Sequence, residues 1–173
     1  MDMRIRCIRR VVTFLMVAGL VEVGGCAGKT QALFTQPELI TRGRLAILGL
    51  TPEQDQIFMA SYIRAFPGQI ITFVERSQLT GILSERDLLR GRLDDRARAR
   101  VKQALGVEAV IICTYYDAES GKAAKKLSVR IVDSSNGVVV GSVITGGRDN
   151  FAYHCDSAVR ALKADIQRGM RQN

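Results

Sequence analysis

Histidine is nearly absent from this chain, since His154 is the only one in 173 residues. A catalytic Cys-His pair must meet in space, but consecutive positions of a helix point about 100° apart, so Cys155 would not face His154. The histidine and cysteine spacing also matches no zinc pattern. We therefore expect no enzyme, no metal and no cofactor, and we interpret His154 as a helix-capping or surface residue.

Paired carboxylates are also scarce outside predicted helix starts. Glu85 with Asp87, and Asp94 with Asp95, stand where a helix begins. The helix dipole favours negative charge at such positions. We interpret the pairs as helix-start charges rather than as acid–base catalysts, which leaves a periplasmic hydrolase as a remote alternative.

No apolar run near the N-terminus is long enough to span a bilayer, for which ~20 residues are needed. The run at residues 11–21 follows four arginines and precedes Val23-Gly24-Gly25-Cys26, which has the form of a bacterial lipobox. Basic, apolar and small-residue zones in this order are typical of an export signal. We predict that residues 1–25 are a lipoprotein signal peptide and that Cys26 carries lipid. The alternative is an ordinary signal peptide or a short anchor with an incidental cysteine.

One glycine of a phosphate-binding loop is missing. Residues 24–30 end in Gly-Lys-Thr, but the motif needs glycine five residues before Gly28, and Val23 stands there. We therefore exclude nucleotide binding at this segment.

Acidic residues are fewer than basic ones, 17 against 25, and removal of residues 1–25 lowers the formal charge from +8 to +6. This balance favours anionic partners. With an export signal, we expect anionic lipid, cell-wall polymer or an acidic protein rather than nucleic acid. Four residues form a candidate docking face, for which ordinary solvated helix surface is the simpler alternative: Arg96, Arg98, Arg100 and Lys102.

Two cysteines fall inside the predicted domain, Cys113 in an apolar strand and Cys155 on the apolar stripe of a helix. An exported protein reaches a compartment that permits disulfides. Buried free thiols are the alternative, because cysteine often serves as a small apolar residue. The sequence leaves both open.

The apolar pattern predicts strand, helix, strand, two helices, three strands and a final helix. Thr51 and Gln54 predict a capping box, Ser77 a second cap, and Asn136-Gly137 a hairpin turn. This order predicts an α/β domain with a single mixed five-stranded sheet and helices packed on it. We place a lipidated tether at 26–43 and the domain at 44–173. The predicted strands are 44–50, 69–75, 109–116, 127–131 and 138–145.

Three stretches resemble the family of the curli secretion channel lipoprotein. They are Phe73–Leu79 with Ile82–Glu85, Ala104–Ile111, and Val129–Val139 with its Asp133-Ser134-Ser135-Asn136-Gly137 hairpin. The resemblance covers roughly residues 44–170 and implies an anticodon-binding-domain-like α/β fold. Activator lipoproteins of peptidoglycan synthases are related in fold.

The membrane-spanning hairpins of the channel family have no counterpart here. Only residues 118–125 and 146–150 stand at the two insertion points, whereas each membrane strand needs ~9–11 residues. We therefore expect a curli-assembly-like accessory module without a pore. Ala27 follows Cys26, and by resemblance to lipoprotein sorting this favours the outer membrane, with the domain facing the periplasm. Activation of a peptidoglycan synthase is the alternative, and oligomeric state stays open.

Overall fold

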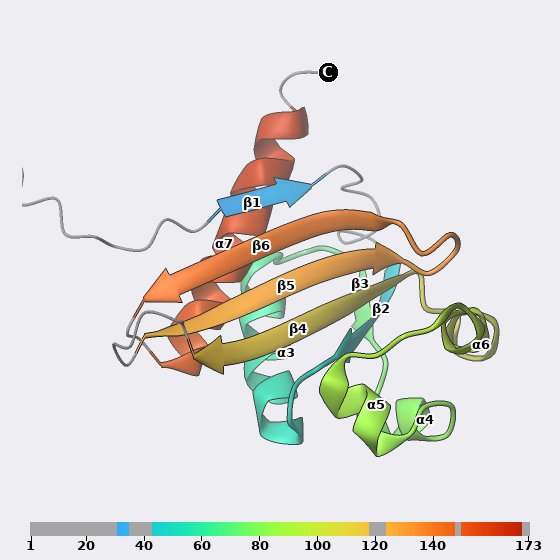
Figure 1. The fold of residues 1–173 in the computed structure, drawn as a ribbon. Coiled ribbons are helices and arrows are strands. Elements are labelled where there is room, and N and C mark those ends of the chain that lie inside the picture. Colours follow the sequence, from blue (N-terminus) through green and yellow to red (C-terminus); the bar gives the residue numbers. More distant parts are fainter. Residues whose placement is uncertain (1–30, 35–42, 118–123, 148–149, 171–173) are drawn as a thin grey trace, which may run out of the picture.

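The computed structural model describes residues 31–34, 43–117, 124–147 and 150–170. These residues form one six-stranded sheet in the order β1-β6-β5-β4-β2-β3, with helices on both faces (Figure 1). The strands are β1 (Gln31–Phe34), β2 (Gly43–Leu48), β3 (Ile71–Phe73), β4 (Ala109–Asp117), β5 (Lys125–Asp133) and β6 (Val139–Gly147). The helices are α3 (Pro52–Ala65), α4 (Arg76–Thr80), α5 (Glu85–Arg90), α6 (Asp95–Leu105) and α7 (Phe151–Met170).

The sheet is mixed, as predicted. β2 pairs in parallel with β3 and β4, while β4, β5 and β6 form an antiparallel meander. Parallel neighbours need a long crossover, which the helices between them supply, whereas antiparallel neighbours can be joined by short turns. The sequence pattern therefore predicted the mixed α/β class correctly.

β1 is the strand that the sequence analysis did not expect, because residues 31–34 fall in the predicted tether. It pairs antiparallel with β6, Gln31 opposite Ile144 and Phe34 opposite Gly141. A four-residue segment has no readable period, and its partner is an edge strand whose backbone would otherwise be exposed. The pairing thus extends the sheet from five strands to six.

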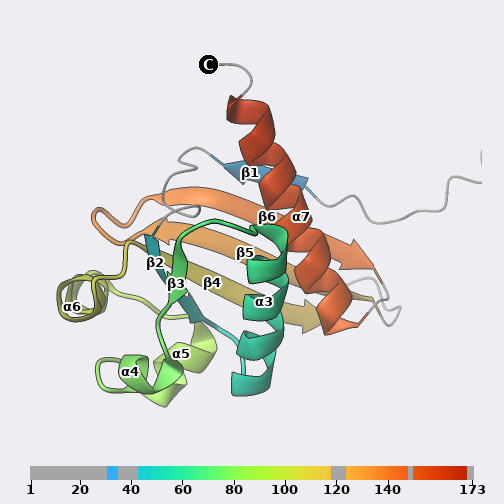
Figure 2. The same cartoon turned by 180° about the vertical axis from the view of Figure 1, so that it is seen from behind.

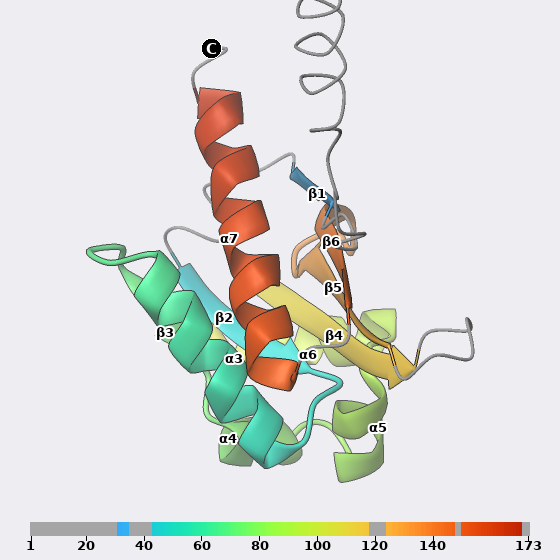
Figure 3. The ribbon, with the colours of Figure 1, turned by 90° about the vertical axis from the view of Figure 1, so that its left-hand side faces the viewer.

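Helices pack on both faces of the sheet, completely on one face and partly on the other. Helices α3 and α7 cover one face (Figure 2), and α4, α5 and α6 cover part of the other near β2 and β4 (Figure 3). The larger apolar core lies under α3 and α7, and its fully enclosed members include Phe58, Tyr62, Ile111 and Leu162. β2 is buried on both faces, which is why its sequence is nearly continuously apolar.

Local signals set most helix ends. Thr51 accepts from the Gln54 amide and Gln54 reaches back, so the predicted capping box is confirmed. Gly106 ends α6 in the left-handed region at φ 63°, as a C-cap glycine should. The predicted cap at Ser77 is wrong: the N-cap of α4 is Glu75, two residues earlier, and it makes no side-chain capping bond.

Candidate functional site

Arg76 joins the starts of three helices. Its Nη1 donates to Asp55 Oδ2 at 2.6 Å and to the Leu50 carbonyl oxygen at 3.0 Å. Its Nη2 donates to Glu85 Oε1 at 2.6 Å. A guanidinium presents several donors in a rigid plane, so one side chain can hold these groups together. Arg76 therefore ties the first turn of α3 and the first turn of α5 to the first residue of α4.

The Asp55–Arg76 ion pair is largely buried, with side chains 8% and 17% exposed. Burial raises the pKa of Asp55 from 3.8 to about 6, although the hydrogen bond and charge of Arg76 act to lower it. Asp55 Oδ1 and Arg76 Nε are both enclosed, and neither has a hydrogen-bond partner among the described residues. A buried orphan polar atom costs about 1–3 kcal/mol and calls for an explanation.

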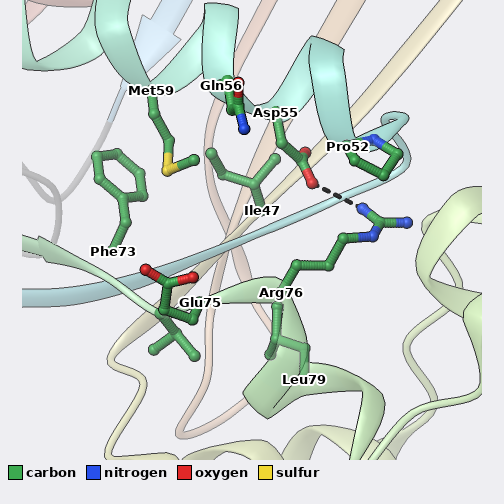
Figure 4. Close-up of a pocket in the computed structure, with 10 residues that line it drawn as sticks. Ile47, Pro52, Asp55, Gln56, Met59, Phe73, Glu75, Arg76 and Leu79 are labelled. Atoms are coloured by element: carbon green, nitrogen blue, oxygen red, sulfur yellow. Dashed lines mark hydrogen bonds and ion pairs between the residues drawn. The ribbon is translucent and has the colours of Figure 1, made fainter.

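A hollow of about 150 Å³ lies beside this ion pair, between α3 and the β3–α4 segment (Figure 4). Met59 and Phe73 stand at one end of it, and Asp55 and Arg76 at the other. We call it the acidic hollow, and its lining residues are Ile47, Pro52, Asp55, Gln56, Met59, Phe73, Val74, Glu75, Arg76 and Leu79.

The charge of this region is opposite to that of the chain. Asp55, Glu75 and Arg76 line the hollow and give it a formal net charge of −1, and Glu85, outside the lining, is a second ionic partner of Arg76. The whole chain carries +8. The hollow thus combines apolar walls with a charged end that holds both carboxylates and a guanidinium.

Sequence reasoning missed Asp55 and Arg76. They lie 21 positions apart, so no motif spacing joins them. Asp55 resembles any carboxylate in a first helical turn, which ordinarily faces solvent and favours the helix dipole. The one usable signal is Arg76 itself, placed two residues after the apolar strand end at Phe73-Val74, where a long charged side chain must pass the core to reach a partner.

The four predicted basic residues do not form one face. Arg98 is only 14% exposed at its side chain and donates to the Ser134 carbonyl oxygen at 2.7 Å, at the β5–β6 turn. Lys102, four positions further along α6, lies on the same side of the helix as Arg98, and its positive charge acts on the carboxyl group of Asp133. Burial alone would raise the pKa of Asp133, but bonds from Ser135 and the charge of Lys102 lower it.

The other two basic residues lie apart from that pair. Arg96 and Arg100 are exposed, and Arg100 lines a separate hollow with Arg92 and Asp94. Positions four apart share a helix face and positions two apart do not. The four cations therefore do not share one helix face, because α6 divides them into an Arg98–Lys102 pair against the turn and an Arg96–Arg100 pair toward solvent, and docking on a partner stays a prediction.

The remaining predicted residues have separate outcomes. Cys26 lies outside the described residues. Cys113 on β4 and Cys155 on α7 are free, buried thiols of the same core, so the disulfide alternative is not realised in this structure. Burial raises the pKa of both, that of Cys155 to about 12, which keeps them protonated and apolar.

The surface position predicted for His154 is wrong. Its side chain is fully buried, with Nδ1 2.7 Å from Thr145 Oγ1 and its ring against Tyr115. His154 precedes Ala158 by four positions on the buried side of α7, and this periodicity could have revealed it.

The described ranges contain no cluster of three or more His, Cys, Asp or Glu side chains placed to hold a metal ion. None of their helices has both the length and the apolarity needed to cross a bilayer.

Comparison with known proteins gives structural neighbours only. No family model matches the sequence, and no curated protein sequence does. The chain is similar to a dodecameric PelC from Paraburkholderia phytofirmans, with TM-score 0.48 and 12% identity over 80% of this chain and 96% of that one. It is also similar to the LpoB C-terminal domain from Salmonella enterica, with TM-score 0.46 and 11% identity over 62% and 83%. Lipoprotein GNA1162 from Neisseria meningitidis gives TM-score 0.40 and 14% identity over 76% and 97%. These values are too low for any function to be carried over.

Proposed function

We propose that this chain is a lipid-anchored protein of the bacterial cell envelope that binds another envelope component and helps its assembly, without catalytic activity of its own. The order of basic, apolar and small-residue zones before Cys26 is the observation that carries the proposal. The acidic hollow supports a binding role, because it offers apolar walls and hydrogen-bond acceptors but no nucleophile beside a base.

Lipid on Cys26 would hold one sheet edge close to the membrane. Only five chain steps separate Cys26 from Gln31, the first residue of β1. A fully extended chain covers ~3.3–3.6 Å per residue, so the span is at most about 18 Å. β3, beside the acidic hollow, is the opposite edge of the six-stranded sheet. At ~4.8 Å per strand, this edge lies about 24 Å from β1. The hollow would thus lie at the edge remote from the anchor.

Metabolic labelling with palmitate tests the anchor. We expect the wild-type chain to incorporate label and the Cys26→Ser variant to incorporate none and to leave the membrane fraction. Cys7→Ser is the matched control, because Cys7 lies in the predicted signal and should not affect labelling. Label that persists in Cys26→Ser would overturn the proposal.

Outer-membrane placement and the partner need separate measurements. Density-gradient fractionation should place the protein with outer-membrane markers, and cofractionation with the inner membrane would contradict that placement.

Crosslinking of tagged protein in intact membranes, followed by purification, should capture an envelope protein. Its identity distinguishes a curli-like secretion system from a peptidoglycan synthase. Recovery of the uncrosslinked chain alone would contradict the binding role.

A further inference from the structure

Taking Cys26 to be lipidated, as proposed above, we infer that one uncovered corner of the sheet docks on the anionic surface of the membrane that holds the anchor. This corner lies on the face of β4, β5 and β6 that is turned away from α3 and α7. We call it the open patch, and it consists of Tyr116, Lys126, Arg130 and Ile144.

Alternation along the strands places these four side chains on one face. Leu127, Val129 and Val143 belong to the core under α3 and α7, so the residues next to them in sequence lie on the other face. Tyr116 is directly opposite Lys126. Ile144 is opposite Ser128, which makes it a diagonal neighbour of both Lys126 and Arg130. Since diagonal neighbours lie only ~7–8 Å apart, the four side chains form one continuous surface.

Helices leave this corner of the sheet uncovered. Helices α4, α5 and α6 pack near β2 and β4, and among the described elements no helix lies over the patch on this side (Figure 1). Tyr116 is 40% exposed and Ile144 is 47% exposed, and Arg130 is exposed beside them. The open patch therefore presents apolar and aromatic groups to an outside partner, as interaction surfaces do.

The charge of the open patch is positive and is not neutralised. Lys126 and Arg130 form no ion pair among the described residues, which gives the patch a formal charge of +2. Asp117, at the end of β4, lies on the other face, where it pairs with Lys125 at 3.1 Å. By sequence, the β4–β5 and β6–α7 connections each hold one acidic and one basic residue, so they leave the balance unchanged. A negatively charged surface complements this patch.

The anchor joins the domain beside the open patch. Gln31, the first residue of β1, pairs with Ile144 of the patch. Because β1 is antiparallel to β6, the chain enters the sheet from the end at which Tyr116 and Lys126 stand (Figure 1). Cys26 precedes Gln31 by five chain steps, which span at most about 18 Å. Lipid on Cys26 would therefore hold the patch within reach of the headgroups.

The side chains of the open patch suit a headgroup region. Tyrosine is enriched where membranes meet water, and the stems of lysine and arginine lie along apolar surface while their charged ends reach outward. Each basic residue near an anionic surface contributes roughly a fivefold gain in affinity, so Lys126 and Arg130 together give roughly 25-fold. This gain is modest by itself, but the anchor makes docking an intramolecular event with a high effective concentration.

An acidic protein could also pair with these two cations. The bilayer is favoured because the anchor already holds it beside Ile144, whereas a protein would have to enter between the patch and the headgroups. We therefore assign the open patch to anionic phospholipid.

Tryptophan reporters test the assignment, because the chain has no tryptophan of its own. Tyr116→Trp places one in the open patch, and Ile70→Trp places one at an 80% exposed position beside β3, the opposite edge of the sheet. Each chain is purified from membranes and reconstituted in vesicles of phosphatidylcholine and phosphatidylglycerol that carry bromine just below the headgroups. We expect several-fold stronger quenching for Tyr116→Trp, with emission at shorter wavelength. Equal quenching, or stronger quenching for Ile70→Trp, would overturn the inference.

Two double variants of the Tyr116→Trp chain test the charge. Lys126→Gln with Arg130→Gln removes both cations of the open patch, and Arg96→Gln with Arg100→Gln removes two exposed cations of α6 outside it. The ratio of docked to undocked chain should fall roughly 25-fold in the first and little in the second. Vesicles of phosphatidylcholine alone should give the same loss as the first variant. Equal losses in both variants, or unchanged quenching without phosphatidylglycerol, would refute recognition of an anionic surface by this patch.

Mass spectrometry of the reconstituted chains separates this inference from the proposed function. Absence of lipid from Cys26 would refute the anchor and, with it, the premise of docking. Lipid on Cys26 without quenching of the Tyr116→Trp chain would refute membrane docking and leave the anchor standing. Crosslinking of the open patch to an acidic envelope protein, with no quenching by the brominated lipid, would overturn the assignment to the bilayer.

Discussion

Asp55→Asn should flatten the pH dependence of stability in a defined direction. Burial raises the pKa of Asp55 in the folded chain from 3.8 to about 6. Between these values the folded state binds the proton more tightly than the unfolded state. The contribution of Asp55 to stability is therefore fully present below about pH 4 and is lost as pH rises through 6.

The size of the effect follows from that pKa difference. A shift from 3.8 to about 6 corresponds to about 3 kcal/mol of stability that wild type loses between acid and neutral pH. Asparagine does not titrate, retains an oxygen that can accept from Arg76, and leaves Glu85 as the ionic partner of Arg76. The free energy of unfolding of wild type minus that of Asp55→Asn should thus fall by about 2–3 kcal/mol from pH 4 to pH 7.

Urea unfolding followed by far-UV circular dichroism measures this difference, since the chain has no tryptophan to report by fluorescence. Asp133 titrates in the opposite sense but is present in both proteins, so its contribution cancels. Glu53→Gln is the control, because Glu53 is exposed in the same helical turn. A difference that stays flat, or that grows in favour of wild type toward pH 7, would show that attraction to Arg76 outweighs desolvation and would refute the reasoning.

Three further outcomes follow from the same contacts. Arg76→Met should destabilise the fold by about 3–5 kcal/mol in urea unfolding, because it leaves Asp55 buried without its cation, and adding Asp55→Leu should recover most of the loss. Arg98→Ala should lower the free energy of unfolding by about 1–3 kcal/mol, because it removes the hydrogen bond to the Ser134 carbonyl oxygen at the turn. Arg96→Ala, at an exposed position, should change it by no more than about 0.5 kcal/mol in the same assay. Equal losses would contradict the division of the basic residues. The two core cysteines should resist a thiol reagent until urea unfolds the chain, and rapid labelling of the native state would contradict their burial.

Short-range chemistry explains what the sequence predicted well. The continuous apolar run of β2, the capping box at Thr51 and the glycine end of α6 each depend on residues within one element. The mixed sheet followed from the order of such elements. These features could be predicted because their causes lie within a few positions of the residues concerned.

Contacts between elements explain what the sequence did not predict. β1 is a strand because β6 offers it an edge, and His154 is buried because α7 packs over Thr145 and Tyr115. Arg98 is drawn away from the expected basic face by a carbonyl 36 positions along the chain. Asp55 and Arg76 meet only when α3 and α4 pack together. The candidate site belongs wholly to this second group, so spacing within the sequence could not reveal it.

The same carboxylate lowers the stability of the domain at neutral pH. With its pKa raised to about 6, Asp55 is ionised at neutral pH at a cost of about 3 kcal/mol to the fold. Oδ1 is enclosed and has no hydrogen-bond partner among the described residues, so desolvation outweighs the hydrogen bond and the charge that Arg76 supplies. Arg76 therefore offsets only part of the cost of burying Asp55, while the same guanidinium ties the starts of three helices together.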